Sequence, residues 1–180
     1  EINEKLVESV IPEPVSITVL QKVLQNLVRE GISIRDLRTI LESLGDYAAV
    51  VTDPMMLTEL VRQNFSRVIT QQYLDHDGYL QVMTLNGVLE EQLLQGVQTN
   101  SQGSFLQLDP VFAQQLIGRL NTAVEESLAH TAQPLLLVGP EVRPHLRQLL
   151  ARFLPNLVII SHNEVAPNAQ LRNILEINFE

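Results

Sequence analysis

Apolar residues recur with a helical period through the first third of the chain. Between residues 17 and 28 they predict an amphipathic helix, which Gly31 ends in a left-handed conformation. A second helix is predicted to start at Ser33, whose hydroxyl would cap free N–H groups. Thr52-Asp53-Pro54 is a further start signal, and helical spacing continues from there to Ile69. The first two apolar stripes are Ile17, Leu20, Val23, Leu24, Leu27 and Val28, and then Ile34, Leu37, Ile40, Leu41 and Leu44.

The pattern changes near residue 78, where a period of about 3.6 gives way to a period of two. Short apolar runs bounded by turn residues then alternate with amphipathic segments, which is typical of strands connected by helices. Two of these runs flank a helix and predict a parallel pair joined by a crossover. The expected strands are residues 79–85, 104–108, 134–139 and 157–161 with an edge strand at 171–179, and the expected helices are residues 88–97, 110–130 and 140–153.

These patterns predict an α+β fold in two parts. An N-terminal all-α helical subdomain, residues 1–75, is followed by a small α/β subdomain, residues 76–180, with a mixed sheet. Few apolar residues are available for burial where the period changes, so we expect the two parts to move as separate bodies about this segment. The candidate hinge residues are Leu74, Asp75, His76, Asp77 and Gly78.

Composition narrows the range of functions. The chain has 180 residues, 45% of them hydrophobic, and its apolar runs are far shorter than the roughly 20 residues of a membrane-spanning helix. Twelve basic and 21 acidic residues give a net charge of −9, which disfavours binding to nucleic acid. The absence of cysteine excludes disulfides and thiolate metal sites. Because the sequence opens on Glu1-Ile2-Asn3 without a methionine, we expect it to be part of a longer protein.

Two motifs place polar side chains next to predicted turns. Asp75, Asp77 and Gly78 match the start of a calcium loop, but the remaining oxygen ligands do not follow, so we expect a plain turn. Ser161-His162-Asn163-Glu164 follows a predicted parallel strand, where α/β enzymes place catalytic groups. A small α/β enzyme that uses His162 or Glu164 is therefore one alternative, and a polar loop that caps the strand is the other.

A third motif offers a place for an anion. Gly139-Pro140 precedes a predicted helix that carries Arg143 and Arg147 on one face, and a helix N-terminus attracts negative charge. No G-x-G-x-x-G motif and no Lys-Ser/Thr pair accompanies it, and a strand-to-helix turn explains the residues equally well. We expect no catalytic residue, no cofactor and no metal in this chain.

The two helices before residue 48 have the outline of a helix-turn-helix. Charged residues off the apolar stripe surround the turn, and Arg38 and Glu42 have the spacing of an ion pair. This charged face is either solvated or a contact with a partner. Two arginines are too few for the roughly 6 to 10 phosphate contacts of a strongly salt-dependent DNA binder. An acidic helix-turn-helix regulator with an α/β ligand-binding domain remains the alternative function.

Several longer phrases resemble a known family. "VLQNLVREGISIRDLRTILESLGDYA", "DPMMLTELVRQNFSRVIT", "QLDPVFAQQLIGRL" and "PLLLVGPEVRPHLRQLLARFLPNLVIISHNEV" are similar to the cytoplasmic domain of the export-gate family of bacterial type III secretion, with its flagellar (FlhA) and injectisome (InvA, YscV) branches. The phrases "PEVRPHLRQLLARFLP" and "SHNEV" favour the flagellar branch. Gly45, where alanine is usual, and Ala166, before Pro167, are small departures.

The resemblance implies a membrane-embedded N-terminal half and a cytoplasmic half of four subdomains that forms a nonameric ring. This chain is similar to the last two subdomains, at the cytoplasmic face of the bacterial inner membrane. No enzymatic activity is implied. Partners would be other copies of the chain, and export chaperone–substrate complexes and ATPase-complex components that bind mainly to missing upstream subdomains, but not nucleic acid. The implied ring-contact residues are Glu30, Arg35, Asp36, Arg38 and Glu42.

Overall fold

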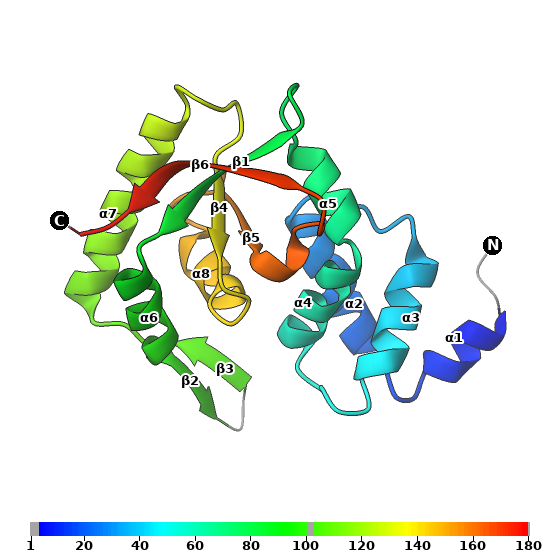
Figure 1. Cartoon of the computed structure of the whole chain (residues 1–180). Coiled ribbons are helices and arrows are strands. Elements are labelled where there is room, and N and C mark those ends of the chain that lie inside the picture. Colours follow the sequence, from blue (N-terminus) through cyan, green and yellow to red (C-terminus); the bar gives the residue numbers. More distant parts are fainter. Residues whose placement is uncertain (1–3, 101–102, 180) are drawn as a thin grey trace. The chain divides into compact units, whose positions relative to one another are not determined.

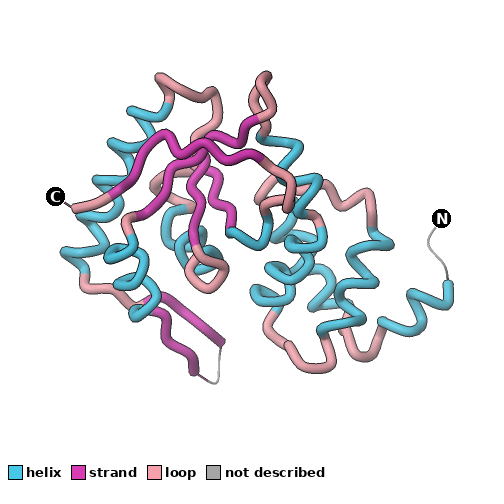
Figure 2. The backbone as a smooth tube through the Cα atoms, in the orientation of Figure 1, coloured by secondary structure: helices cyan, strands magenta, loops and turns pink. Residues whose placement is uncertain are grey.

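The computed structural model describes residues 4–100 and 103–179, and the chain divides into two compact units. Unit 1 is Glu1–Ile69 and unit 2 is Thr70–Glu180. Helices alone form unit 1, whereas strands and helices alternate in unit 2, as Figures 1 and 2 show. The predicted α+β fold class is confirmed.

Unit 1 consists of helices whose ends follow local chemistry. The first long helix ends in a Schellman motif: Gly31 adopts φ 73°, its N–H donates to the Val28 carbonyl, and the Ile32 N–H donates to the Leu27 carbonyl. Gly31 therefore has the role that the sequence predicts. The helices are α1 (Glu4–Val10), α2 (Ile17–Arg29), α3 (Leu37–Tyr47), α4 (Pro54–Asn64) and α5 (Ser66–Tyr73), which continues into unit 2.

The predicted start of the second helix at Ser33 is wrong. Helix α3 begins at Leu37, because the Asp36 carboxylate accepts hydrogen bonds from both the N–H and the hydroxyl of Thr39, at 3.1 and 2.7 Å. The Ser33 hydroxyl accepts only a long bond of 3.4 Å from the N–H of Arg35. A charged carboxylate is the stronger cap, so residues 33–36 form a loop and Ile34 leaves the α3 stripe.

The helix predicted from residue 54 to residue 69 is two helices. Phe65 separates α4 from α5 with φ −95° and ψ 12°, and its N–H donates to the Arg62 carbonyl at 3.0 Å. Apolar spacing continues through this break, so the sequence pattern does not reveal it.

Helix α4 packs against both α2 and α3. Two polar contacts fix this arrangement: Asn26 donates to the Thr58 hydroxyl at 3.2 Å, and Asn64 donates to the Ser43 hydroxyl at 2.6 Å. Helix α1 packs against α3, where a Cβ at Gly45 would lie 3.2 Å from the Val10 side chain. The departure at Gly45 therefore coincides with a close approach of two helices.

A four-stranded parallel sheet with the order β5-β4-β1-β6 forms the centre of unit 2. Two further strands form a separate antiparallel hairpin, so the antiparallel component of the predicted mixed sheet is not part of the main sheet. Strand β6 lies at one edge and pairs with β1 along its whole length, as predicted for an edge strand. The strands are β1 (Tyr79–Leu85), β2 (Val97–Asn100), β3 (Gly103–Leu106), β4 (Leu135–Val138), β5 (Val158–Ser161) and β6 (Gln170–Ile177).

Three helices and a short 3-10 helix complete unit 2. Helix α7 contacts β6, and α8 contacts β5 and the hairpin strand β3 (Figure 1). Asp109 caps α7 through the N–H groups of Val111 and Phe112, as the Asp-Pro signal predicts. The core includes Met83, Leu116, Leu136, Leu146 and Ile159, all buried. The helices are α6 (Gly87–Gly96), α7 (Pro110–Ser127), α8 (Arg143–Leu150) and η1 (His162–Glu164).

The unit boundary lies between Ile69 and Thr70, so the predicted boundary after residue 75 falls inside unit 2. The reason is a contact that sequence periodicity does not report. Thr70 is bonded to the segment after β5, which draws the second half of α5 into unit 2.

Candidate functional site

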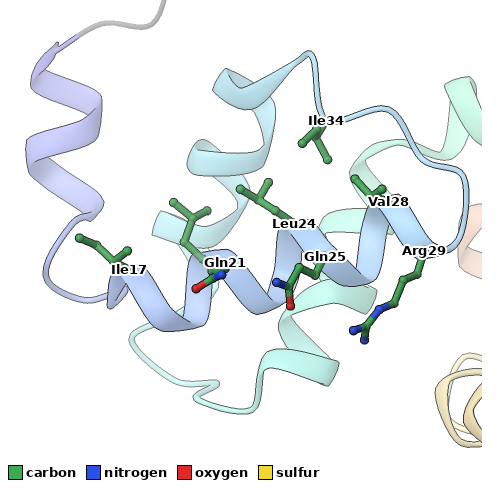
Figure 3. Close-up of a pocket in the computed structure, with 8 residues that line it drawn as sticks. Ile17, Gln21, Leu24, Gln25, Val28, Arg29 and Ile34 are labelled. Carbon is green, nitrogen blue, oxygen red and sulfur yellow. The ribbon is translucent and has the colours of Figure 1, made fainter.

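A groove with an open apolar surface lies along α2. It encloses about 570 Å³ and combines one side of α2 with a residue from the loop before α3. Figure 3 shows Leu24 and Val28 on the side of α2 that faces Ile34, with Arg29 pointing away. Ile17 and Val28 are 69% and 54% exposed, which is high for large apolar side chains. We call this the α2 groove, and its residues are Ile17, Leu20, Gln21, Leu24, Gln25, Val28, Arg29 and Ile34.

The groove exists because the packing of unit 1 covers only part of the width of the apolar stripe of α2. Helix residues are about 100° apart, so the six residues of the predicted stripe, from Ile17 to Val28, span roughly 140°. Val23 and Leu27, at one margin of the stripe, are fully buried. Ile17 and Val28, at the other margin, remain exposed. The stripe was predicted, but its division into a buried margin and an exposed margin was not.

A charged rim begins where the groove ends. Arg35 follows the groove residue Ile34 directly, and both are exposed. On α3, Arg38 Nε donates to Glu42 Oε1 at 2.8 Å, which confirms the ion pair that their spacing predicts. Asp36 serves as the α3 cap, and the hydrogen bonds from the Thr39 hydroxyl and N–H lower its pKa. We call Arg35, Arg38 and Glu42 the charged rim.

Glu30 differs from the other predicted ring-contact residues. Its carboxylate lies 3.2 Å from the guanidinium of Arg62 on α4, and the Arg62 side chain is only 3% exposed. This ion pair joins the end of α2 to α4 inside unit 1. Glu30 therefore has a stabilising role within the subunit, whereas the charged rim is directed to the solvent.

The residues of the motif Ser161-His162-Asn163-Glu164 lie in different surroundings. Glu164 is 1% exposed and its carboxylate lies 3.3 Å from Nε of Arg143, which is equally buried. Arg143 also donates to the Ile159 carbonyl at 3.0 Å. Ser161 is buried and His162 is exposed on η1. The carboxylate thus fastens α8 to the end of β5, and its partner Arg143 was assigned by sequence reasoning to a different motif.

At Gly139, the place that the sequence offered for an anion, the backbone N–H is bound by the protein's own carboxylate. Glu90 on α6 accepts the hydrogen bond from the Gly139 N–H, and a Cβ at Gly139 would lie 3.2 Å from the same oxygen. Arg143 is committed to Glu164, and an Arg147 guanidinium nitrogen lies 3.5 Å from the Leu157 carbonyl. The strand-to-helix turn therefore serves the fold, with Glu90 in the place of an external anion.

The segment from Leu74 to Gly78 is a hydrogen-bonded turn. Asp75 Oδ1 accepts from the N–H groups of Asp77 and Tyr79, and its Oδ2 accepts from the Gln81 amide at 2.7 Å. Gly78 adopts φ 85°, which explains the glycine, and exposed His76 lies 3.5 Å from Asp77. Leu74 forms a bridge with Leu80. The plain turn expected here is what the structure contains.

Two further properties concern the described residues alone. In residues 4–100 and 103–179, no three His, Cys, Asp or Glu side chains gather in a way that suits a metal ion. None of the helices in that same part of the chain has the length and apolarity needed to cross a membrane.

Comparisons with known proteins agree along almost the whole chain. The sequence profile of the FHIPEP family matches residues 1–170. The flagellar biosynthesis protein FlhA of Bacillus subtilis (strain 168) is 37% identical over 94% of this chain, which spans about a quarter (25%) of that protein. CdsV in the Chlamydia pneumoniae CdsV and CdsO complex is 29% identical with a TM-score of 0.87, over 97% of this chain and 51% of that one. The nonameric EscV cytosolic domain from the type III secretion system is 28% identical with a TM-score of 0.79, again over 97% and 51%.

Proposed function

Because the chain belongs to the FHIPEP family, we propose that it is a cytoplasmic part of the export gate of a bacterial type III secretion apparatus. It assembles with other copies into a ring that receives and passes export substrates. The ring is supported by the likeness to the nonameric EscV cytosolic domain. Its place is the cytoplasmic face of the bacterial inner membrane, and its role is assembly and transport without catalysis.

The observation that carries the ring proposal is the α2 groove. Exposed apolar patches with a polar rim mark protein–protein contacts, because leaving them in water forgoes the free energy of burial. The groove provides the apolar centre of such a contact, and Arg35 with the ion pair of Arg38 and Glu42 provides the charged rim. In a closed ring each subunit presents one surface to the next subunit and a different surface to the previous one. The groove with its rim is one of these two surfaces.

We assign the chain to the flagellar branch. Its identity to the flagellar protein of Bacillus subtilis is 37%, against 29% and 28% for CdsV and EscV. The partners proposed for the whole protein are chaperone–substrate complexes and components of the ATPase complex, which bind mainly through segments upstream of this chain. The CdsV and CdsO complex supports a further protein partner for this family.

The test uses charge substitutions in the full-length protein. Val28→Glu places a carboxylate in the α2 groove, and Arg35→Glu reverses a charge of the rim. Both should abolish protein export and motility, because a neighbouring subunit would have to bury or oppose the new charge. Both residues are exposed, so the melting temperature of the purified chain should hardly change, as is usual for surface substitutions within about 0.5 kcal/mol.

Two further variants serve as controls. Val88→Glu alters a valine on α6 that is 67% exposed and lies outside the groove, and export should remain normal. The double variant Arg38→Glu with Glu42→Arg keeps the ion pair of α3 but exchanges the two charges. It should impair export only if a neighbouring subunit contacts these side chains and its contacts depend on where each charge lies. Normal export in Val28→Glu would remove the groove from the ring contact. A large fall in melting temperature would instead make Val28 part of the fold.

A further inference from the structure

A ring contact needs a second surface that fits the α2 groove. Each subunit of a ring offers one surface to the next copy and a different surface to the previous one. The second surface has to present an exposed apolar side chain that can fill the groove. It also has to carry negative charge, because Arg29 and Arg35 beside the groove are exposed and have no ion pair with the residues that the structure describes.

Two exposed valines of unit 1 lie outside the groove. Val50, in the loop between α3 and α4, is 81% exposed, and Val68 on α5 is 52% exposed. Val68 directly follows Arg67, which is also exposed. Docking of Val68 would therefore bring a positive charge toward the arginines beside the groove, which disfavours the contact. Val50 is the better fit for an apolar groove with a basic edge.

An acidic residue accompanies Val50. The Ala48 N–H donates to the Leu44 carbonyl at 2.9 Å, as in a regular helix. The Val50 N–H donates to the Tyr47 carbonyl at 3.0 Å, so the chain continues to turn after α3. Asp46 stands four residues before Val50, and residues at this spacing in a helical turn are neighbours on one side. Asp46 is exposed and forms no ion pair with the rest of the described chain.

We propose that Val50 of one copy of the chain enters the α2 groove of the next copy, where Asp46 pairs with Arg35. The proposal rests on the proposed function and names the surface that the groove receives. Burial removes two apolar surfaces from water, and the charges beside them are of opposite sign. Val50 is not a groove residue, so one subunit can use both surfaces at once, as a ring requires.

The absence of cysteine from the chain makes a direct test possible. The full-length protein receives Val28→Cys in the groove and Val50→Cys in the loop, and a short cross-linker that reacts with thiols is added to cells. Joined copies should appear on a denaturing gel as a ladder of dimers, trimers and larger products. Each single variant is a control and should give no ladder, because one cysteine per chain cannot link more than two copies.

The pair Val28→Cys with Val68→Cys is the matched comparison and should give no ladder. A ladder from this pair would place α5 in the groove and overturn the proposal. A strong dimer from Val28→Cys alone would show two grooves facing each other, which also overturns it. The absence of a product from Val28→Cys with Val50→Cys would mean that Val50 is not the occupant.

The result of this test is separate from that of the proposed function. If Val28→Glu blocks export but the Val28–Val50 pair gives no ladder, only the assigned occupant is wrong. If Val28→Glu exports normally, the groove itself is not part of the ring contact.

An exchange of charges tests the pairing of Asp46 with Arg35. Asp46→Arg alone should block export, as Arg35→Glu does, because it sets like charges against each other. The double variant Asp46→Arg with Arg35→Glu restores opposite charges across the contact and should restore export. Arg35→Glu with Glu91→Arg is the control: it restores the net charge at an exposed position of α6, so export should remain blocked. Failure of the Asp46 exchange to restore export would overturn the pairing.

Discussion

The buried ion pair of Arg143 and Glu164 shows what single residues contribute in unit 2. Both side chains are 1% exposed, and together they join α8 to the segment after β5. Removing one partner from such a pair leaves a buried charge without its counter-ion, which typically costs about 3 to 5 kcal/mol. Breaking the pair by removing one partner should therefore destabilise unit 2, although the presence of the pair is weak evidence for high stability.

We expect Arg143→Met to lower the free energy of unfolding of unit 2 by roughly 3 to 5 kcal/mol. The double variant Arg143→Met with Glu164→Leu should lose less than the single variant, because no charge then remains to be buried. Urea titrations followed by circular dichroism measure both values. Equal losses in the two variants would show that the ion pair itself, and not the stranded carboxylate, sets the cost.

Asp75 provides a pH-dependent contribution to the free energy of unfolding. The hydrogen bonds from the Gln81 amide and from the N–H of Tyr79 lower the pKa of this carboxyl. A carboxyl whose pKa is lower in the folded state stabilises the fold above its unfolded pKa of about 3.9, and this stabilisation is lost as the pH falls through the folded pKa. The Asp75 turn should therefore weaken only in acid.

The comparison of wild type with Asp75→Ala isolates this effect. Their difference in free energy of unfolding should be constant near neutral pH and should shrink below about pH 4. Asp77→Ala is the control, since within the described residues the Asp77 carboxylate lies beside the exposed ring of His76, at 3.5 Å. A difference that does not change with pH would contradict the assigned hydrogen bonds.

Among the elements, α1 and α3 meet at a glycine that has a measurable role. A Cβ at Gly45 would lie 3.2 Å from a methyl group of buried Val10, whereas a Cβ at Gly118 on α7 would meet nothing within 4 Å. Alanine favours a helix over glycine by about 1 kcal/mol where space allows.

Gly118→Ala should therefore stabilise the protein by up to about 1 kcal/mol, and Gly45→Ala by clearly less, because Val10 must give way. In a Val10→Ala background the same change at Gly45 should regain its benefit. The expected coupling between the two sites is about 0.5 kcal/mol or more, measured by a double-mutant cycle in urea. Additive effects would show that α1 moves away from α3 at little cost.

Elements with their own local signals are predictable from the sequence. The end of α2 at Gly31 and the start of α7 at Asp109 are examples, because backbone groups within a few residues satisfy them. The start of α3 was misassigned because Ser33 and Asp36 both resemble caps. The break at Phe65 is hidden by continuous apolar spacing, and neither α1 nor the polar strand β2 was predicted.

Features that depend on distant partners were beyond sequence reasoning. Arg143 and Glu164 stand in separate motifs, and only the packing of α8 on β5 joins them. The α2 groove depends on which margin of a wide stripe α4 covers. The charged residues at positions 35, 38 and 42 were identified, but the apolar surface beside them was not.

At the scale of the whole molecule, the two units differ in how their contacts are spread along the chain. Unit 1 closes through contacts between helices that are at most two apart in the chain (α2 with α4, α3 with α4, α1 with α3), whereas unit 2 depends on β6, which pairs with β1 along its full length. Ile177 of β6 is fully buried in the core of unit 2.

Truncation after Asn168 should therefore unfold unit 2 and spare unit 1. The loss of β6 removes the pairing on one side of every residue of β1, leaves only the short pairing with β4, and opens the core, so the NMR signals of unit 2 should collapse while those of unit 1 persist. Removal of residues 178–180 alone is the control. It takes away the Arg119 bond to the Asn178 carbonyl and the Phe112–Phe179 ring contact, and should only weaken unit 2.

The pairing of β1 with β6 also determines when the sheet of unit 2 can be completed during synthesis of the chain. Roughly 85 residues separate the end of β1 from the start of β6, and ribosomes add about 5 to 20 residues per second, so the β6 side of β1 stays unpaired for on the order of 4 to 17 s. Unit 1, with its short-range contacts, has ample time to fold on the nascent chain in that interval. During this interval the nascent chain carries a folded helical unit followed by an apolar strand with one unpaired edge. This is the period in which we expect it to depend most on chaperones.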